Sequence, residues 1–361
     1  MIAKTAFREM ISMSALLENF NVIHVIWMIT LGFLLTSILT CVMIIFRRIR
    51  RNRIGNERDR QKTAFQTALL GSLKLSDDEK LDLPECDIRE ISSTLLHLFR
   101  TLKGQHFETL QDQVCATDVE THLIDATKIG IRGTRMRALK VLSYLNSDTS
   151  LIAAFDRLNS SDKYVRLTAA RALAKRRAHI FLKDIITSLV EAFPDNPDIT
   201  AYILVDFGHD ACSFLEDHIE TSENSIERIA CLKALYELRP SKIGIDLSDL
   251  VRSKDPALAI SAISLASVTN QANIIAPMIE GLSRDETKLK ISTSKIASKL
   301  RRKKLVPALY ELTDDPELWV RYWALKAIWN TGTSGRQFID ALAHKNPTAA
   351  DLSLEMRSGY V

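Results

Sequence analysis

The sequence predicts an all-α protein in which one transmembrane helix precedes a HEAT-like stacked array of helix pairs. Two observations support this prediction. The run from Val22 to Phe46 contains 25 residues without Asp, Glu, Lys or Arg. From about residue 131 onward, a degenerate motif recurs every 31 residues, which is typical of a repeat array. Aromatic residues are sparse at 7%, in agreement with an alanine- and leucine-rich helical chain rather than a β-sandwich or barrel.

The apolar run is long enough to cross a membrane. At 1.5 Å per residue it forms about 37 Å of helix, against a hydrocarbon core of about 30 Å. A cleaved signal peptide is the alternative, but its apolar region is only about 7–15 residues long and ends at a small-residue cleavage site. This run is longer and ends in arginines. The sequence therefore predicts a short extracytoplasmic N-terminus over residues 1–21 and an uncleaved anchor over residues 22–46.

Basic residues predict the orientation of this anchor. Only Lys4 and Arg8 precede the apolar run, whereas eight basic and two acidic residues stand between Arg47 and Lys62. Because positive flanks stay in the cytoplasm, we expect the N-terminus outside and the C-terminal part inside, at a bacterial inner membrane. Residues 47–62 would form a basic juxtamembrane linker. The arginines expected to contact anionic headgroups, at about 1 kcal/mol each, are Arg47, Arg48, Arg50, Arg51 and Arg53. A topology signal without lipid specificity is the alternative.

Residues 63–130 are predicted to form an atypical helical cap, because a terminal repeat cannot bury its outer face on a neighbour. Asp87 and Glu90 have the spacing of a capping box and predict a helix start at Ile88. The run 76–84 is an acidic break. The expected helices are Ala64–Leu75, Ile88–Leu102, Phe107–Val114 and Val119–Ile129.

Residues 131–361 carry the 31-residue motif and a capping helix at about 348–356. Four residues after each motif start stands a small residue; these residues are Ala138, Ala169, Thr200, Cys231, Ala262, Thr293 and Ala324. The motif begins the second helix of each pair. The clear first helices are Leu151–Leu158, Ile185–Phe193, Ala211–His218, Ile274–Leu282, Leu305–Leu312 and Gln337–Ala343.

The segments Asp162–Leu173 and Leu305–Ile328 resemble HEAT repeats, and the short period resembles the branch that is also found in phycobilisome lyases. The resemblance covers roughly residues 131–357. It implies an α-solenoid fold and, since most members are scaffolds or adaptors and some are enzymes, it implies little about function.

Two rows of basic residues follow the motif. The row one position after the motif start, with Arg135, Arg166, Arg228, Lys290 and Arg321, lies toward the core side of the helix. We expect it to pair with acidic turn residues and to connect neighbouring repeats, as the Asp–Arg ladder of HEAT families does.

The row six positions after the motif start lies on the opposite side of each second helix and predicts a positive concave face. Rows of like charge suit an acidic protein segment or anionic headgroups, and a merely solvated face is the alternative. The residues expected to bind a partner are Lys140, Arg171, Tyr202, Lys233, Lys295, Trp323 and Lys326.

Catalytic, cofactor and metal motifs are absent from the sequence. No phosphate-binding glycine loop, nucleophile elbow or zinc-protease motif occurs, and no histidine stands next to a glutamate. The five cysteines include no C-x-x-C pair and are expected to be reduced thiols. We therefore expect no catalytic residue, no cofactor, no metal and no small-molecule substrate.

These features predict a membrane-tethered cytoplasmic scaffold or adaptor that is not an enzyme. Its partner would be a protein that is membrane-associated or has an acidic segment, such as an envelope or polysaccharide-synthesis glycosyltransferase. The alternative, implied only by the repeat branch, is a bilin lyase or isomerase, which would co-purify with a coloured chromophore. Nucleic-acid binding is disfavoured, because the net charge outside residues 47–62 is −2.

Overall fold

A computed structural model describes residues 27–50, 60–69, 71, 86–269 and 274–358, and the chain divides into two compact units, residues 1–94 and 95–361. The predicted N-terminus 1–21, the start of the predicted anchor and the acidic break 76–84 lie outside the described residues. Every regular element among the described residues is a helix, so the all-α prediction is confirmed for this part of the chain.

The first unit contains the apolar helix Trp27–Arg50. It has a mean hydropathy of 2.5 and is long and apolar enough to cross a membrane, a criterion that a signal sequence also meets. The helix runs one turn beyond the predicted end at Phe46, because arginines are good helix formers. The hydroxyls of Thr36 and Thr40 donate to the carbonyls of Gly32 and Thr36, which satisfies polar groups in an apolar segment.

The first unit also contains a helix over residues 60–69. The division between the two units falls within α2 (Ile88–Thr101). The Asp87 carboxylate accepts a hydrogen bond from the backbone N–H of Arg89 at 3.1 Å, so Asp87 caps α2 and the predicted helix start at Ile88 is confirmed.

In its described residues, the second unit contains the end of α2, then α3 (Gln105–Ala116) and eight helix pairs. The first helices are α4 (Asp118–Ile129), α6 (Asp148–Asp156), α8 (Leu182–Ala192), α10 (Cys212–Thr221), α12 (Ser248–Val251), α14 (Ile275–Ser283), α16 (Val306–Glu311) and α18 (Thr333–Leu342). The second helices are α5 (Arg132–Leu142), α7 (Lys163–Lys175), α9 (Pro197–Val205), α11 (Ser225–Leu238), α13 (Pro256–Val268), α15 (Thr287–Leu300), α17 (Leu318–Trp329) and α19 (Pro347–Arg357). Short 3₁₀ turns flank several first helices: η1 (Arg157–Asn159), η2 (His179–Phe181), η3 (His209–Ala211), η4 (Lys303–Leu305) and η5 (Leu312–Asp314).

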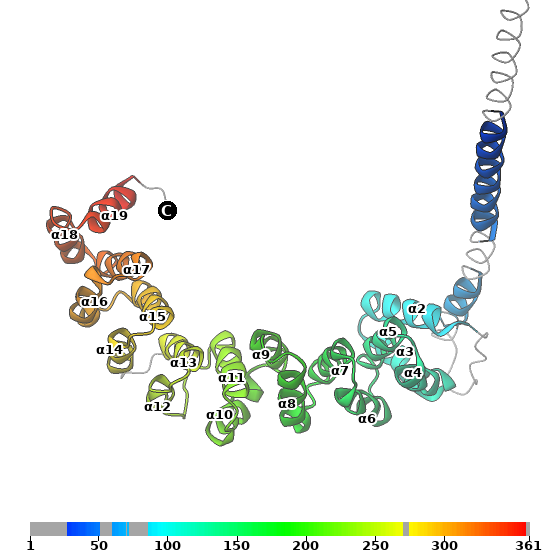
Figure 1. Cartoon of the computed structure of the whole chain (residues 1–361). Coiled ribbons are helices and arrows are strands. Elements are labelled where there is room, and N and C mark those ends of the chain that lie inside the picture. The colour runs from blue at the N-terminus through cyan, green and yellow to red at the C-terminus, as the bar shows by residue number, and fades with distance from the viewer. Residues whose placement is uncertain (1–26, 51–59, 70, 72–85, 270–273, 359–361) are drawn as a thin grey trace, which may run out of the picture. The chain divides into compact units, whose positions relative to one another are not determined.

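Each first helix packs against the second helix that follows it, and each second helix packs against the next second helix. Within this unit, Figure 1 shows the second helices α7 to α17 in succession along the inner side of the array and the first helices along its outer side. This arrangement of stacked pairs is an α-solenoid, as the HEAT-like resemblance implies.

The small residues of the second helices lie in the core of the array. All seven of them, Ala138, Ala169, Thr200, Cys231, Ala262, Thr293 and Ala324, have no exposed surface. Burial raises the pKa of the Cys231 thiol, which keeps it protonated and suits a packing role. Small side chains at these positions allow the backbones of successive pairs to approach closely.

One first helix is much shorter than its counterparts. Helix α12 has only four residues and follows Arg239, whose φ of 50° ends α11 in the left-handed region. Pro240 and Gly244 stand between the two helices and disfavour a longer helix there. No clear first helix was predicted for this pair, and the residues Pro240 and Gly244 explain why.

In the basic row on the core side, Lys290 connects successive pairs through an acidic turn residue as expected, whereas Arg166 and Arg321 reach the next pair through other acceptors. Arg166 donates to the Ser160 carbonyl and to Glu191 of α8, and Arg321 donates to the carbonyls of Asp315 and Pro316. The Lys290 ammonium lies 2.8 Å from the Asp315 carboxylate in the next pair, and both side chains are largely buried. Asp162 and Asp255 cap α7 and α13, and Asp162 also lies 2.6 Å from the Arg132 guanidinium of α5.

The Lys290–Asp315 pair makes a testable contribution to stability. Burial raises the pKa of Asp315, but hydrogen bonds from Lys290 and the Glu317 backbone outweigh it, so the pKa lies below 3.8. Stability from a carboxylate with a lowered pKa is present above the unfolded pKa and is lost as pH falls through the folded pKa. The substitution Asp315→Asn keeps an oxygen that can accept from the Glu317 backbone N–H and removes the charge. We expect it to reduce the free energy of unfolding by about 2 kcal/mol at pH 7.

Thermal unfolding of wild type and Asp315→Asn, followed by circular dichroism at pH 7, 5 and 3, checks this prediction. The difference between the two proteins should persist at pH 5 and shrink by pH 3. A constant difference at all three pH values would show that the ion pair contributes nothing.

Candidate partner-binding face

The residues predicted to bind a partner lie on the side of the second helices that faces away from the first helices, which we call the second-helix face. Their side chains are at least partly exposed, and Tyr202 has 64% of its surface exposed. They come from different helices in succession, α5, α7, α9, α11, α15 and α17. The face is thus assembled by the stacking of the pairs rather than by any single loop.

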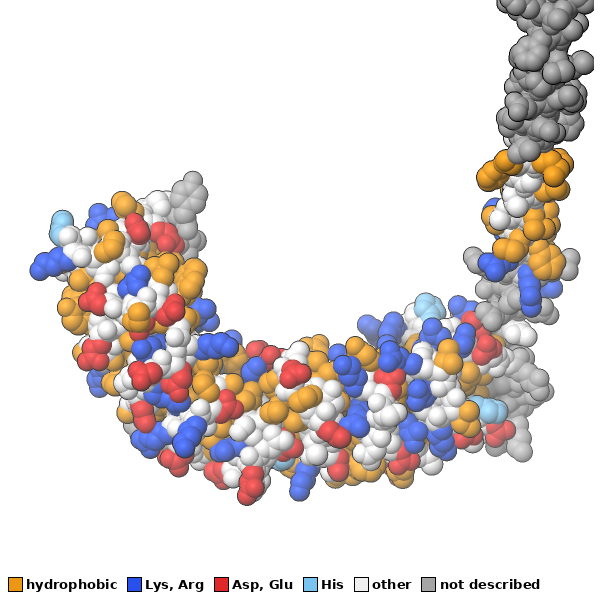
Figure 2. Space-filling model, in the orientation of Figure 1, with side chains coloured by type: hydrophobic (Ala, Val, Ile, Leu, Met, Phe, Trp, Pro, Cys, Tyr) orange, Lys and Arg blue, Asp and Glu red, His pale blue; other side chains and the backbone are white. Residues whose placement is uncertain are grey.

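The start of this face carries a group of basic residues, the N-terminal basic patch. It consists of Arg100, Arg137, Lys140, Arg171 and Lys175, all exposed. Figure 2 shows Lys and Arg side chains gathered over α5 and α7. Among the described residues, none of these five cations forms an ion pair with a carboxylate. The patch therefore presents uncompensated positive charge.

Tyr144 lies in the N-terminal basic patch and holds two of its cations in place. Its ring stacks on Phe99 with centroids 5.3 Å apart, and the Lys175 ammonium lies over the same ring. Burial raises the pKa of Tyr144, but hydrogen bonds from Lys175 and Arg100 outweigh it and lower the pKa below 10. Burial also lowers the pKa of Lys175.

The middle of the second-helix face is not basic. Lys233 of α11 lies 2.6 Å from the Asp198 carboxylate of α9, so its charge is compensated within the chain. Asp206 and Glu237 are exposed close to the ends of the same two helices. Helix α13 contributes Ser264 and no charged residue. The face therefore changes from basic to neutral or acidic along α9, α11 and α13.

The far end of the face carries a lysine–tryptophan cluster, formed by Lys295 of α15 and Trp319, Trp323 and Lys326 of α17. The ammonium groups of Lys295 and Lys326 lie 4.9 and 5.3 Å from the centre of the Trp323 ring. Trp319 has 59% of its surface exposed. The neighbouring Tyr322 hydroxyl donates to Glu355 of α19 at 3.0 Å.

The basic row was predictable from the sequence, but other residues that determine its charge were not. Asp198 lies on the same side of its helix as Tyr202, and its pairing with Lys233 required the contact between α9 and α11. Trp319 was not predicted either, because it stands just before the motif start and lies outside the row six positions after it. Its side chain joins the face because the helix begins one residue earlier, at Leu318.

The structure describes only some of the arginines that are predicted to contact lipid headgroups. Arg47, Arg48 and Arg50 are exposed on the last turn of the apolar helix, whereas Arg51 and Arg53 lie outside the described residues.

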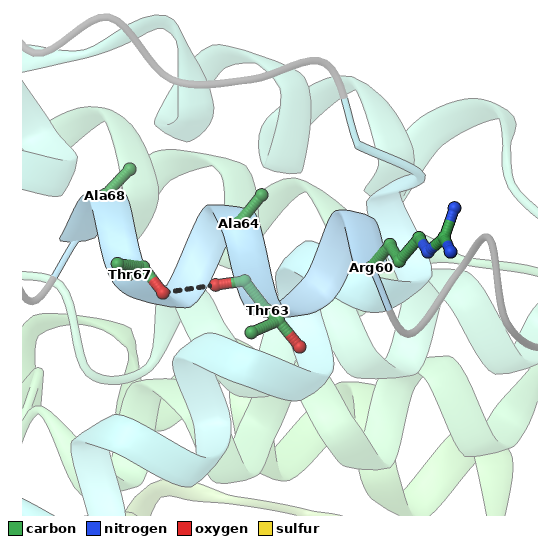
Figure 3. A pocket seen from close by; sticks show the side chains of 5 residues that line it. All are labelled: Arg60, Thr63, Ala64, Thr67 and Ala68. Carbon is green, nitrogen blue, oxygen red and sulfur yellow. Dashed lines mark hydrogen bonds between the residues drawn. The ribbon is translucent and has the colours of Figure 1, made fainter.

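Cavities in the described parts do not resemble a catalytic site. One of about 630 Å³ in the first unit is lined by a single helix, through Arg60, Thr63, Ala64, Thr67 and Ala68 (Figure 3), where the Thr67 hydroxyl donates to the Thr63 carbonyl. Another of about 300 Å³ lies beside α4 and α6. Among the described residues, no group of three His, Cys, Asp or Glu side chains could hold a metal ion.

One histidine does lie against a glutamate in space. The buried His218 ring nitrogen is 2.9 Å from Glu227, which also accepts hydrogen bonds from Ser222 and Thr187. These partners join α8, α10 and α11, so the pair is part of the packing between helices.

No protein-family model and no curated protein matches the chain. Among solved structures, the karyopherin Kap121p bound to the SUMO protease Ulp1p aligns with 81% of this chain and 39% of its own length, at 14% identity and a TM-score of 0.42. Kap121p bound to Nup53p aligns with 80% of this chain and 37% of its own length, at 15% identity and a TM-score of 0.41. Human deoxyhypusine hydroxylase in complex with glycerol aligns with 71% of this chain and 100% of its own length, at 13% identity and a TM-score of 0.29. The chain thus spans less than half of the karyopherin's length, and likenesses of this degree assign no function to it.

Proposed function

We propose that this protein is a membrane-tethered adaptor that captures a protein partner on the second-helix face. In this proposal Trp27–Arg50 belongs to a single transmembrane span, the N-terminus is outside and the helix pairs are in the cytoplasm. The pairs would be 31-residue HEAT-like repeats of the branch that includes the phycobilisome lyases. The partner would be membrane-associated or carry an acidic segment.

The observation that carries the proposal is the uncompensated charge at both ends of the second-helix face. Lys140, Arg171, Lys295 and Lys326 form no ion pair with an acidic residue in the described part of the chain. In the core-side row, by contrast, Arg166 pairs with Glu191 and Lys290 pairs with Asp315, both in the next helix pair. These two cations are therefore compensated within the chain, whereas Lys140, Arg171, Lys295 and Lys326 remain available to a partner.

Tethering makes weak contacts sufficient. An exposed ion pair contributes only about 0.2–1 kcal/mol, so several pairs along the face would give modest affinity. A partner held in the same membrane is present at a high effective concentration, which compensates for weak individual contacts. This requirement explains why an adaptor with an exposed, partly polar face would also carry an anchor.

Charge reversal on the face tests this function. We expect the triple variant Lys140→Glu, Lys295→Glu, Lys326→Glu to recover its partner about tenfold or more less efficiently from native membranes, because three favourable pairs become repulsive. The measurement is cross-linking in native membranes followed by quantitative mass spectrometry.

A matched control separates this effect from net charge. The triple variant Lys183→Glu, Lys303→Glu, Lys304→Glu makes the same change in charge at exposed positions on the first-helix side. It should recover the partner as wild type does. Equal recovery by all three proteins, with unchanged helix content, would exclude the face as the binding site.

A further inference from the structure

We infer that the segment bound on the second-helix face carries two separate anionic clusters, joined by a linker with little charge that spans about four helix pairs. The inference rests on the proposed function and specifies the chemistry of the partner. It follows from how charge is distributed along the face, which is basic at both ends and not in the middle.

The N-terminal basic patch offers the first site. Arg137 and Lys140 stand one turn apart on α5, and Arg171 and Lys175 stand one turn apart on the adjacent α7. Arg100 and Lys175 lie close to Tyr144, and the Lys175 ammonium lies over its ring. Like charges on adjacent helices repel each other, and an anion of the partner would relieve that repulsion.

The lysine–tryptophan cluster offers the second site. Because the two ammonium groups of Lys295 and Lys326 lie 4.9 and 5.3 Å from one ring centre, they are at most about 10 Å apart. Two neighbouring acidic residues of one segment can reach both of them. The exposed ring of Trp319 beside them offers apolar contact to the same segment.

The middle of the face would repel an acidic segment. Asp198 neutralises Lys233, while Asp206 and Glu237 remain exposed and α13 adds no charge. For a continuously acidic partner, repulsion at the centre of the face would therefore cancel part of the favourable binding energy gained at its two ends. A partner with acidic ends and a linker of low charge avoids this loss.

The stacking of the helices sets the length of that linker. From α7 to α15 there are four steps between adjacent second helices, by way of α9, α11 and α13. Interaxial distances of about 8–10 Å per step give about 36 Å along the face. An extended chain at about 3.3 Å per residue covers this with about eleven residues.

Peptide rulers test the spacing directly. Each fluorescent peptide has three glutamates at both ends, separated by 4 or 12 prolines, which at about 3.1 Å per residue hold the ends about 12 or 37 Å apart. Binding to the full chain in neutral detergent is measured by fluorescence anisotropy. We expect the 12-proline peptide to bind about tenfold or more tightly than the 4-proline peptide, since only the longer ruler can engage both sites at once.

Two variants test whether each of the two basic sites binds one acidic end of the longer peptide. Lys140→Glu with Arg171→Glu removes the first site, and Lys295→Glu with Lys326→Glu removes the second; each should abolish the preference for the longer ruler. The double variant Lys183→Glu, Lys304→Glu on the first-helix side should retain it. Equal affinity of the two rulers for wild type would overturn the two-site inference while leaving the adaptor function standing. Binding of neither peptide would count against both.

Discussion

The substitution Ala169→Asp is expected to unfold the helix pairs around α7. Ala169 has no exposed surface and belongs to the hydrophobic core, and its helix α7 packs against α5, α6, α8 and α9. A carboxylate there has no room and no partner, and an uncompensated buried charge costs about 3 kcal/mol or more. Because each pair is stabilised by its neighbours, the loss should spread to α5 and α9. Trypsin should then cleave rapidly at Arg166 and Arg176, which are partly buried in the folded chain.

A control two residues away isolates the effect of burial. Arg171→Asp introduces the same side chain into the same helix at an exposed position and should leave both the helix content and the trypsin pattern close to wild type. If Ala169→Asp were as resistant to trypsin as this control, tight packing at the small-residue positions would not be what holds the pairs together.

Two arginines within the apolar helix should release the protein from the membrane. Leu35 and Ile38 lie in the middle of Trp27–Arg50. Each arginine at the centre of a spanning helix costs about 2.5–3.5 kcal/mol, and each lost apolar residue adds a few tenths more. We expect the variant Leu35→Arg, Ile38→Arg to move from the membrane fraction to the supernatant after a carbonate wash.

The matched control places two arginines at exposed isoleucines of the second unit, Ile152→Arg and Ile180→Arg. This protein should stay in the membrane fraction. A Leu35→Arg, Ile38→Arg variant that also resisted the carbonate wash would contradict the anchor, and with it the tethering on which the proposed function depends.

The helices of the second unit were predictable because their pattern is local. Residues such as Ala262 and Ala324 recur at one position of each second helix, and that period alone placed them in the core. Capping residues such as Asp87 fixed a helix start for the same reason. The four-residue α12 could not be placed, because a helix that short has too few residues to show a period.

The character of the candidate site was only partly predictable, because it depends on contacts between helices. The row of basic residues follows from helical spacing, but the pairing of Lys233 with Asp198 joins residues on separate helices. The approach of Lys295 to Trp323 likewise needs α15 and α17 side by side. The exposed side of each helix can be predicted from the periodicity of the sequence. Which charges on that side are compensated depends on contacts between stacked helices.

Photocross-linking from single positions in native membranes tests the central claim most directly. A photoreactive phenylalanine analogue at Tyr202, on the second-helix face, is compared with the same analogue at Ile152, which is exposed on the first helix α6. We predict one discrete protein adduct from position 202 that disappears in the triple variant Lys140→Glu, Lys295→Glu, Lys326→Glu. The same adduct from position 152, or an adduct from position 202 that persists in the triple variant, would contradict capture on the second-helix face.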